Sequence, residues 1–246
     1  MELGSNTVLV TGGASGIGLA LAGRFLEAGS AVIACGRRAE KLQEAKAIHP
    51  ELETRVCDLA REEERAALVR WATEKFPRLN VLVNNAGIQL RVSLSDPREW
   101  ERVRQEIAIN FDAAAHLSML FVPHLRAQPR SAIVNVTSGL AFVPLARVPV
   151  YSATKAALHS FTRSLRLQLA GTGVGVIEII PPAVDTDLGG PGLHTFGVPV
   201  DELLDAVMPR IEAGDTEIAY GFAEKASRGS REEIQALIQR MNEPAG

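Results

Sequence analysis

The fold is decided by Thr7-Val8-Leu9-Val10-Thr11-Gly12-Gly13-Ala14-Ser15-Gly16-Ile17-Gly18. The first five residues are β-branched or apolar and predict a buried strand, and the pattern of residues 19–28 predicts a helix. A strand, a glycine-rich turn and a helix form a dinucleotide-binding loop, in which backbone and helix N-terminus approach a pyrophosphate. The spacing Gly12-x-x-x-Gly16-x-Gly18 differs from the commoner Gly-x-Gly-x-x-Gly, so a glycine-rich turn without a ligand stays open as an alternative.

Segments with strand and helix patterns alternate along the rest of the chain. This alternation predicts one α/β domain over residues 1–246, a doubly wound parallel sheet of about seven strands with helices on both faces, as in Rossmann-like proteins. We expect the strands at residues 7–11, 31–35, 53–57, 79–83, 132–137, 175–180 and 217–220, and the helices at residues 19–28, 39–48, 61–76, 97–125, 151–169, 200–213 and 231–241.

Composition indicates an ordinary globular protein. Of its 246 residues, 46% are hydrophobic and 22% charged, and 26 basic against 29 acidic residues leave a net charge of −3. Nucleic-acid binding and binding to anionic membranes need a basic surface, so neither is expected. No apolar run reaches the about 18 residues of a membrane span, and residues 1–7 are too short and polar for a signal peptide. We therefore expect a cytoplasmic protein.

Neither cysteine nor histidine spacing predicts a metal site. Cys35 and Cys57 stand alone rather than in a paired motif, and the five histidines are scattered. Two cysteines cannot complete a four-cysteine zinc site. We expect no metal, and two buried free thiols rather than a disulfide.

A candidate acid/base pair stands at Tyr151-Ser152-Ala153-Thr154-Lys155. The spacing of four places the tyrosine and the lysine on one face of a helix, one turn apart. An ammonium group favours the phenolate and lowers the pKa of a phenol, which suits a general acid or base near neutral pH. An ordinary amphipathic helix is the alternative for a lone Tyr-x-x-x-Lys.

Two arginines follow the second predicted strand. The strand ends in Gly36-Arg37-Arg38, beside the expected position of the adenosine ribose. An acid there favours NAD, whereas a guanidinium suits the 2′-phosphate of NADP. NADP is therefore expected, with Arg37 the first candidate and Arg38 the second. The alternative is that both arginines cap or solvate the next helix.

Polar residues also mark the ends of later strands. Asp58 closes the third strand and is a candidate either for the adenine amino group or for the N-cap of the next helix. Asn84-Asn85-Ala86-Gly87 predicts a turn that lets a ligand come close. Asn110 lies in an apolar helix and needs a partner, either a water or a backbone group beneath the site. Ser138 follows the fifth strand, at the edge where α/β sheets bind ligands.

These motifs, in this order and spacing, resemble those of short-chain dehydrogenases/reductases of the single-domain type over essentially the whole chain. The stretches Val136-Thr137-Ser138-Gly139-Leu140-Ala141-Phe142 and Pro181-Pro182-Ala183-Val184-Asp185-Thr186 also resemble those of DltE-like oxidoreductases. The resemblance implies an oxidoreductase that transfers a hydride between a nicotinamide cofactor, NADPH in preference to NADH, and a carbonyl or alcohol substrate.

The resemblance also implies roles for individual residues. Tyr151 would be the general acid or base, Lys155 would lower its pKa and bond the nicotinamide ribose, and Ser138 would bond the substrate oxygen. Asn110 would hold a water that links Lys155 to solvent. The residues implied in cofactor binding are Gly12, Ser15, Gly16, Ile17, Gly18, Arg37, Arg38, Asp58, Leu59, Asn85, Ala86, Gly87, Tyr151, Lys155, Pro181, Val184 and Thr186.

The chain departs from the family pattern at three places. Ser15 is not basic, so the preference for NADP depends on Arg37 and Arg38. Pro182 stands where relatives usually carry glycine. Ala219-Tyr220-Gly221-Phe222 replaces the usual Val-Asp-Gly-Gly ending, and a further helix follows. The last departure puts the usual C-terminal tetramer contact in doubt.

Two alternatives to an NADP-dependent enzyme stay open. One is the same chemistry with NAD, and the other is a dinucleotide-binding regulator without catalysis. The resemblance implies a homodimer or homotetramer, with the predicted helices at residues 98–125 and 151–169 as the candidate interface. Residues 89–92, 140–149 and 188–198, including a glycine- and proline-rich lid within the substrate loop at about 186–199, would shape an apolar pocket for a small molecule.

Overall fold

The molecule is built around one parallel sheet. The computed structural model describes residues 1–243, and in this range seven strands pair in the order β3-β2-β1-β4-β5-β6-β7. Every strand pair is parallel, which confirms the doubly wound sheet expected from the sequence. The strands are β1 Thr7–Thr11, β2 Ala31–Gly36, β3 Glu53–Val56, β4 Val81–Asn84, β5 Ser131–Val136, β6 Val174–Ile180 and β7 Glu217–Ala219.

The chain order reverses between β1 and β4, which are neighbours in the sheet. Chain segments leave β1 toward β2 on one side and leave β4 toward β5 on the other. A crevice opens above the carboxyl ends of the strands at such a reversal, and ligands of open α/β sheets bind there. The sheet therefore places its candidate site above the ends of β1, β4 and β5.

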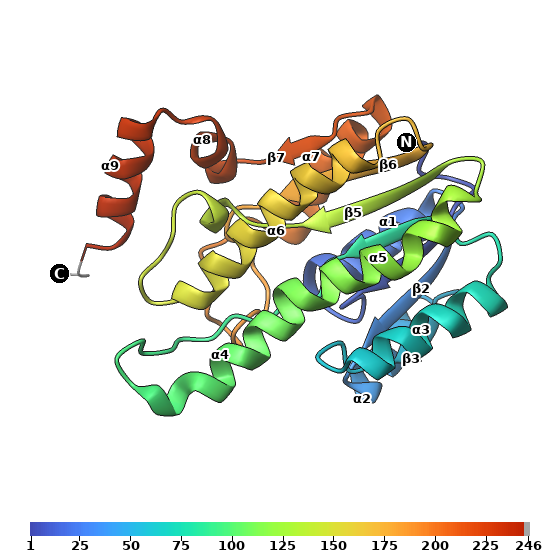
Figure 1. Ribbon diagram of the computed structural model, residues 1–246, viewed down its shortest axis with the longest axis horizontal. Coiled ribbons are helices and arrows are strands. Elements are labelled where there is room, and N and C mark those ends of the chain that lie inside the picture. Colours follow the sequence, from blue (N-terminus) through green and yellow to red (C-terminus); the bar gives the residue numbers. More distant parts are fainter. Residues whose placement is uncertain (244–246) are drawn as a thin grey trace.

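Helices cover both faces of the sheet (Figure 1). Residues of α1 Gly16–Glu27, α2 Ala39–Ile48 and α7 Val200–Ala213 share one core cluster with the strands. Residues of α3 Glu62–Lys75, α5 Ala113–Arg126 and α6 Pro149–Gln168 share the other. The sheet is thus the middle of three layers, as the alternation of strand and helix patterns predicts.

In strand β1, alternate side chains point to opposite faces of the sheet. Val8 and Val10 belong to the core cluster beneath α1 and α7, whereas Leu9 between them belongs to the cluster beneath α5. Successive side chains of a strand point to opposite faces, so a strand buried on both faces reads as a continuous apolar run. All three residues have no exposed surface, and they anchor the glycine-rich turn that follows.

The segment expected as one long helix at residues 97–125 is helical, as predicted, but it is not one continuous α-helix. The segment runs as a 3₁₀ turn at Pro97–Glu99, α4 Trp100–Ile107, a π-helical turn at Ala108–Asp112 and then α5. A π-helical turn inserts one extra residue into a helix and is frequent at functional sites. Periodicity alone does not reveal it, because the apolar pattern continues on both sides.

Other expected boundaries shift by a few residues. The third strand ends at Val56 rather than at residue 57, and α3 begins at Glu62 with Arg61 as its N-cap. Asp58 is therefore not the N-cap of α3; its carboxylate instead accepts from the backbone N–H of Ala60 at 3.1 Å. The short helix α8 Phe222–Arg228 was not predicted, since its seven residues carry too little periodicity.

The last two helices stand apart from the layered sheet. In Figure 1, α8 and α9 Arg231–Met241 extend beyond β7. A capping box starts α9, in which Ser230 and Glu233 each bond the other's backbone N–H. The structure reproduces the predicted bounds of α9, but none of its residues is fully buried.

Both cysteines are buried and free, as expected. Burial raises the pKa of the Cys57 thiol to about 12 and that of the Cys35 thiol further, so neither is a nucleophile near neutral pH. Among residues 1–243, no helix is long and apolar enough to cross a membrane.

Candidate active site

Tyr151 and Ser138 meet above the end of β5. Pro149 starts α6, a position where its missing N–H costs nothing, and Tyr151 follows in the first turn. The Ser138 side chain, two residues after the end of β5 at Val136, acts to lower the pKa of the Tyr151 hydroxyl. Tyr151 is 7% exposed and Ser138 6% exposed. The predicted phenol and hydroxyl thus form one buried pair at the ligand-binding edge of the sheet.

Lys155 lies beneath Tyr151, one turn along α6. Its Nζ donates to the carbonyl of Val136 at 2.8 Å and lies 5.6 Å from the centroid of the Tyr151 ring. Burial lowers the pKa of Lys155 to about 8. The tyrosine and lysine therefore share a helix face, as their spacing predicts.

The pKa of Tyr151 moves in the direction opposite to the one expected. Burial raises it, the bond from Ser138 lowers it by less, and the charge of Glu106 raises it further. Lys155 is not among these causes. The low dielectric around the buried phenol outweighs the partners that the protein alone supplies.

Asn110 occupies the π-helical turn and bonds the backbone of the segment after β4. Its Oδ1 accepts from the N–H of Ile88 at 2.8 Å, and its Nδ2 donates to the carbonyl of Ile88 at 2.8 Å. A third bond runs from Nδ2 to Thr154 Oγ1 on α6 at 3.2 Å. The Asn110 amide is thereby hydrogen-bonded to a backbone group. This is one of the two alternatives, a water or a backbone group, that its apolar surroundings predicted. It joins the helix, the segment above β4 and α6.

The turn after β1 is tied to the turn after β4. Thr11 Oγ1 accepts from the N–H groups of Asn85 and Ala86 at 2.9 and 3.1 Å, and donates to Val83 O at 3.1 Å. The Asn85 Nδ2 donates to the carbonyl of Thr11 at 2.9 Å. These bonds bring the predicted glycine-rich loop and the Asn84–Gly87 quartet together at the crevice.

The N-terminus of α1 suits an anionic ligand. Ser15 is its N-cap residue but makes no side-chain cap bond, and the first turn holds no acidic residue. Gly12 and Gly16 have φ values of +64° and +53°, which other residues rarely adopt. A Cβ on Gly16 would lie 3.2 Å from Thr186 Cγ2, so the segment after β6 closes over this turn. A dinucleotide pyrophosphate fits this end of the helix.

The residues predicted beside the adenosine lie at the ends of β2 and β3. Arg37 and Arg38 are exposed, and the described residues contain no ion pair for either. Asp58 and Leu59 follow β3, with the Leu59 side chain buried. Arg38 is the N-cap residue of α2, so the alternative that the arginines cap or solvate this helix holds in part. Its side chain makes no cap bond, and both exposed guanidinium groups are available to an anion.

The segment after β6 completes the crevice. Gly139 N–H donates to the carbonyl of Pro181 at 3.0 Å, which links this segment to the loop of Ser138. Val184 and Val198 form an isolated parallel bridge, with Asp185 N–H donating to Val198 O at 2.9 Å. The predicted lid is thus a loop whose two ends are pinned together, and Val184 and Thr186 lie at its base.

Glu106 is a site residue that the sequence did not reveal. It lies one turn before Asn110, has no exposed surface, and accepts from the Leu90 N–H at 3.0 Å through Oε1. Its Oε2 has no hydrogen-bond partner in the described part of the chain. Burial raises the pKa of Glu106 to about 7, and its charge acts on Tyr151. Its position four residues before Asn110, on the same helix face, could have indicated a site residue. Helix periodicity alone, however, does not distinguish a buried carboxyl from an exposed one.

Comparisons with known proteins identify the family of the chain. The family model for short chain dehydrogenase matches residues 6–193. The uncharacterized oxidoreductase DltE of Bacillus subtilis is 48% identical over 248 aligned positions, covering 98% of each chain. A short chain dehydrogenase of Burkholderia cenocepacia, solved in complex with NADP, superposes with a TM-score of 0.85 at 29% identity, covering 99% of this chain and 100% of that one. A 3-ketoacyl-(acyl-carrier-protein) reductase of Brucella melitensis, complexed with NADH, gives 0.79 at 25% identity, covering 88% and 97%.

The fold and the arrangement of Ser138, Tyr151 and Lys155 define an oxidoreductase built on a dinucleotide-binding sheet. The chain belongs to the short-chain dehydrogenase/reductase family, and it is similar over nearly its whole length to the DltE oxidoreductase. The resemblance read from its motifs is therefore confirmed.

Proposed function

We propose that the protein is an NADP-dependent carbonyl reductase or alcohol dehydrogenase in which Tyr151 is the general acid or base. The observation that carries the proposal is the burial of Tyr151 and Ser138 at the carboxyl end of β5, where Ser138 acts to lower the pKa of the Tyr151 hydroxyl. We infer that both hydroxyls can bond a single substrate oxygen. That is the geometry needed to stabilise charge on the oxygen and to move a proton.

The nicotinamide cofactor supplies or accepts the hydride when bound. In reduction, Tyr151 donates its proton to the substrate oxygen as the hydride reaches the carbon, and Ser138 donates a second hydrogen bond to the same oxygen. In oxidation, Tyr151 takes the alcohol proton back. Ser138 lowers the pKa of Tyr151, and the ammonium form of Lys155 below it adds positive charge beneath the phenol.

Lys155 and Asn110 complete the proton path in this proposal. The lysine has a pKa of about 8, so it can exchange a proton with Tyr151 near neutral pH. Asn110 bonds the backbone of Ile88 through Oδ1 and Nδ2, and in this proposal it holds the water next to Lys155 that the family resemblance implies. Gly87 lies between them, since a Cβ there would be 3.4 Å from Asn110 Oδ1 and 3.8 Å from Lys155 Nζ.

The preference for NADP rests on Arg37 and Arg38. Both guanidinium groups are exposed after β2 without a carboxylate partner among residues 1–243, and a 2′-phosphate would pair with them. The Burkholderia relative was solved with NADP, which supports this choice. The Brucella relative was solved with NADH, and this observation favours NAD as the second candidate.

Turnover of a carbonyl panel with NADPH, and of alcohols with NADP⁺, tests the proposal. Replacing Tyr151 by Phe removes the transferable proton without changing the packing, so kcat falls by about 10²–10⁴-fold while NADPH binding is retained. Full activity of Tyr151→Phe excludes this mechanism. Cofactor binding without turnover of any substrate supports the regulator instead.

A homo-oligomer is part of the proposal. An apolar hollow of about 400 Å³ opens between α4 and α6 on the outer side of the molecule, and the neighbouring side chains of Leu94 and Trp100 are 73% and 60% exposed. A second copy would cover this apolar surface. Sedimentation equilibrium gives a multiple of 26.4 kDa if it does, and the mass of one chain overturns it. The hollow is lined by Leu94, Val103, Ile107, Phe111, Pro149, Val150, Ala153, Thr154 and Ala157.

A further inference from the structure

Three segments meet beside the Tyr151 hydroxyl and form the rim of the site: residues 89–92, 140–148 and 188–198. A Cβ on Gly189 would lie 3.1 Å from the carbonyl of Gln89, so the third segment packs on the first. Leu188 packs against the cluster of Leu145, Val148 and Tyr151, so it also packs on the second. The substrate enters through this rim if the proposed function is correct, and the following inference rests on that function.

His194 lies in the rim with an unsatisfied nitrogen. Its Nδ1 is buried and has no hydrogen-bond partner in the described residues. Burial lowers the pKa of His194, and the charges of Arg147 and Arg91 lower it further. The backbone of Leu188 and the carboxylate of Asp185 act in the opposite direction. The charges of Arg91 and Arg147 thus both act on His194, and the two arginines belong to the two segments that pack on residues 188–198.

The two arginines differ from most arginines on the same end of the molecule. Arg98 and Arg102 hold carboxylates of Asp96 and Glu99 in ion pairs. Arg91 and Arg147 are exposed, and neither has an ion pair among residues 1–243. Two exposed guanidinium groups without a carboxylate partner are available to an anion.

We propose that Arg91 and Arg147 together bind an anionic group of the substrate, a carboxylate or a phosphate, at the end remote from the reacting carbonyl. A guanidinium pairs with either anion through two parallel N–H bonds. The residues that pack with Tyr151 beneath these arginine-bearing segments are apolar, namely Leu140, Leu145, Val148, Leu188 and Met241. The substrate class is thus an oxo compound with an apolar middle and an anionic end.

Two matched pairs of substrates test the inference with NADPH. The first compares ω-oxo acids, from succinate semialdehyde to azelate semialdehyde, with their methyl esters. The second compares acetoacetyl-CoA with neutral acetoacetyl-N-acetylcysteamine. A lower KM for the anionic member of one pair is expected, and the pair that shows it identifies carboxylate or phosphate as the anion.

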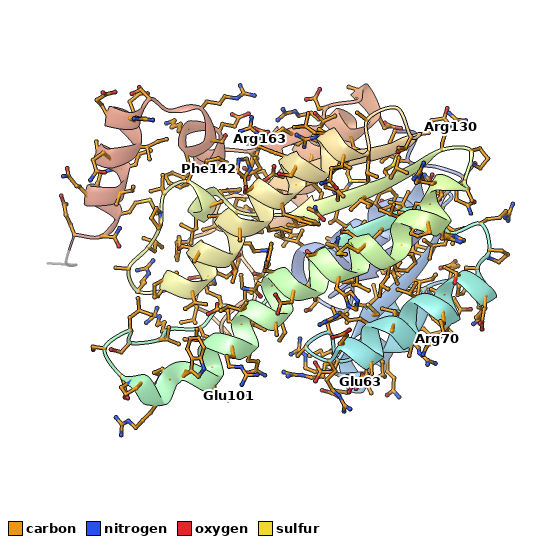
Figure 2. The ribbon with its side chains drawn as sticks, viewed as in Figure 1. Glu63, Arg70, Glu101, Arg130, Phe142 and Arg163 are labelled. Atoms are coloured by element: carbon orange, nitrogen blue, oxygen red, sulfur yellow. The ribbon has the colours of Figure 1, made fainter. Side chains whose placement is uncertain are left out.

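The variants Arg91→Gln, Arg147→Gln and the double variant remove the charges while keeping polar side chains. Each single change raises KM for the anionic substrate by about tenfold, the double change by about a hundredfold, and kcat and KM for the neutral partner stay constant. Arg70→Gln is the matched control, since Arg70 is exposed on α3, away from the rim (Figure 2). Equal KM values for anionic and neutral members in both pairs overturn the inference while leaving the proposed function intact.

A binding measurement keeps the inference separate from turnover. Calorimetric titration of adipate, and then of coenzyme A, into the protein with NADP⁺ reports the anion site even if no substrate is reduced. Binding that the double variant loses and Arg70→Gln retains supports the inference. No binding of either probe by the parent protein overturns it, and the absence of turnover of every substrate overturns the proposed function instead.

Discussion

The floor and the rim of the site are built in different ways. The floor consists of Thr11, Asn85, Asn110, Ser138 and Lys155, and the rim consists of residues 89–92, 140–148 and 188–198. Floor residues follow buried strands or lie inside helices, and they bond backbone groups of neighbouring elements. The rim is made of loops whose side chains range from buried to exposed, and it is held by apolar contacts and a few bonds.

The floor and the rim are therefore constrained to different degrees. Floor positions are rigid because any shift would break several buried hydrogen bonds at once, and each unsatisfied group would cost about 1–3 kcal/mol. The rim has no such constraint, so its charges and shapes can change while the proton-transfer geometry stays. Specificity should therefore reside in the rim and chemistry in the floor.

Lys155→Met should lower activity strongly without lowering stability. We expect kcat to fall by about 10³-fold, since the charge beneath Tyr151 is lost. The folded pKa of Lys155, about 8, lies below its ordinary value of 10.5, so the folded state binds fewer protons between these values. Stability thus increases with pH in this window, and at pH 7 the buried amine costs up to about 3 kcal/mol. Thermal unfolding at pH 7 should show Lys155→Met to be at least as stable as the parent, and unchanged kcat would remove Lys155 from the floor.

Arg37→Ala tests the nucleotide end of the crevice. Loss of a charge-assisted bond to a 2′-phosphate raises KM for NADPH by about 10–100-fold and leaves KM for NADH unchanged. Arg38→Ala should have the smaller effect of the two. Steady-state kinetics with both cofactors checks this, and tighter binding of NADH than of NADPH by the parent protein contradicts the choice of NADP.

Glu106→Gln probes the boundary between floor and rim, because Glu106 bonds Leu90 of the rim and its charge reaches Tyr151. The amide retains an acceptor for the Leu90 N–H and removes the charge that raises the pKa of Tyr151. In alcohol oxidation, which needs the phenolate, the acidic limb of the kcat/KM profile should move to lower pH. If the pH profile of kcat/KM does not shift, the role of Glu106 is only to bond the Leu90 backbone.

The same substitution makes a prediction about stability. Burial raises the pKa of Glu106 from 4.5 to about 7, so the folded state binds more protons than the unfolded state between these values. Stability is therefore lost as pH rises through this window, by on the order of 1–2 kcal/mol. Glu106→Gln should unfold at higher temperature than the parent at pH 8 and at a similar one at pH 4, measured by calorimetry.

Asn242→Ala should have the smallest effect and confine it to the rim. Asn242 Oδ1 accepts from the Ala146 N–H at 2.6 Å, and its Nδ2 donates to the Pro144 carbonyl at 3.0 Å. Without these bonds the loop beside Arg147 loosens, so KM rises a few-fold while kcat and the unfolding temperature change little. A large loss of kcat would show that the end of α9 supports the floor as well.

Much of the floor was readable from the chain because its residues sit at element boundaries. The glycine-rich turn, the Asn84–Gly87 quartet, Ser138 and the Tyr151/Lys155 pair each follow a recognisable strand or helix pattern. Sequence analysis did not predict features that the local residue pattern does not encode. The π-helical turn around Asn110, the buried carboxyl of Glu106 and the direction of the Tyr151 pKa all depend on neighbours from distant segments.

The sequence by itself determined the parallel sheet, the crevice at its switch point and the residue types that carry proton transfer. It could do so because strand and helix periodicity and glycine spacing are local properties of the chain. Only the tertiary structure decided which side chains lose their water, which charges face one another across the rim, and how Asn242 reaches the loop at Pro144. Desolvation and charge interactions depend on distances between segments far apart in the chain, and those distances exist only after folding.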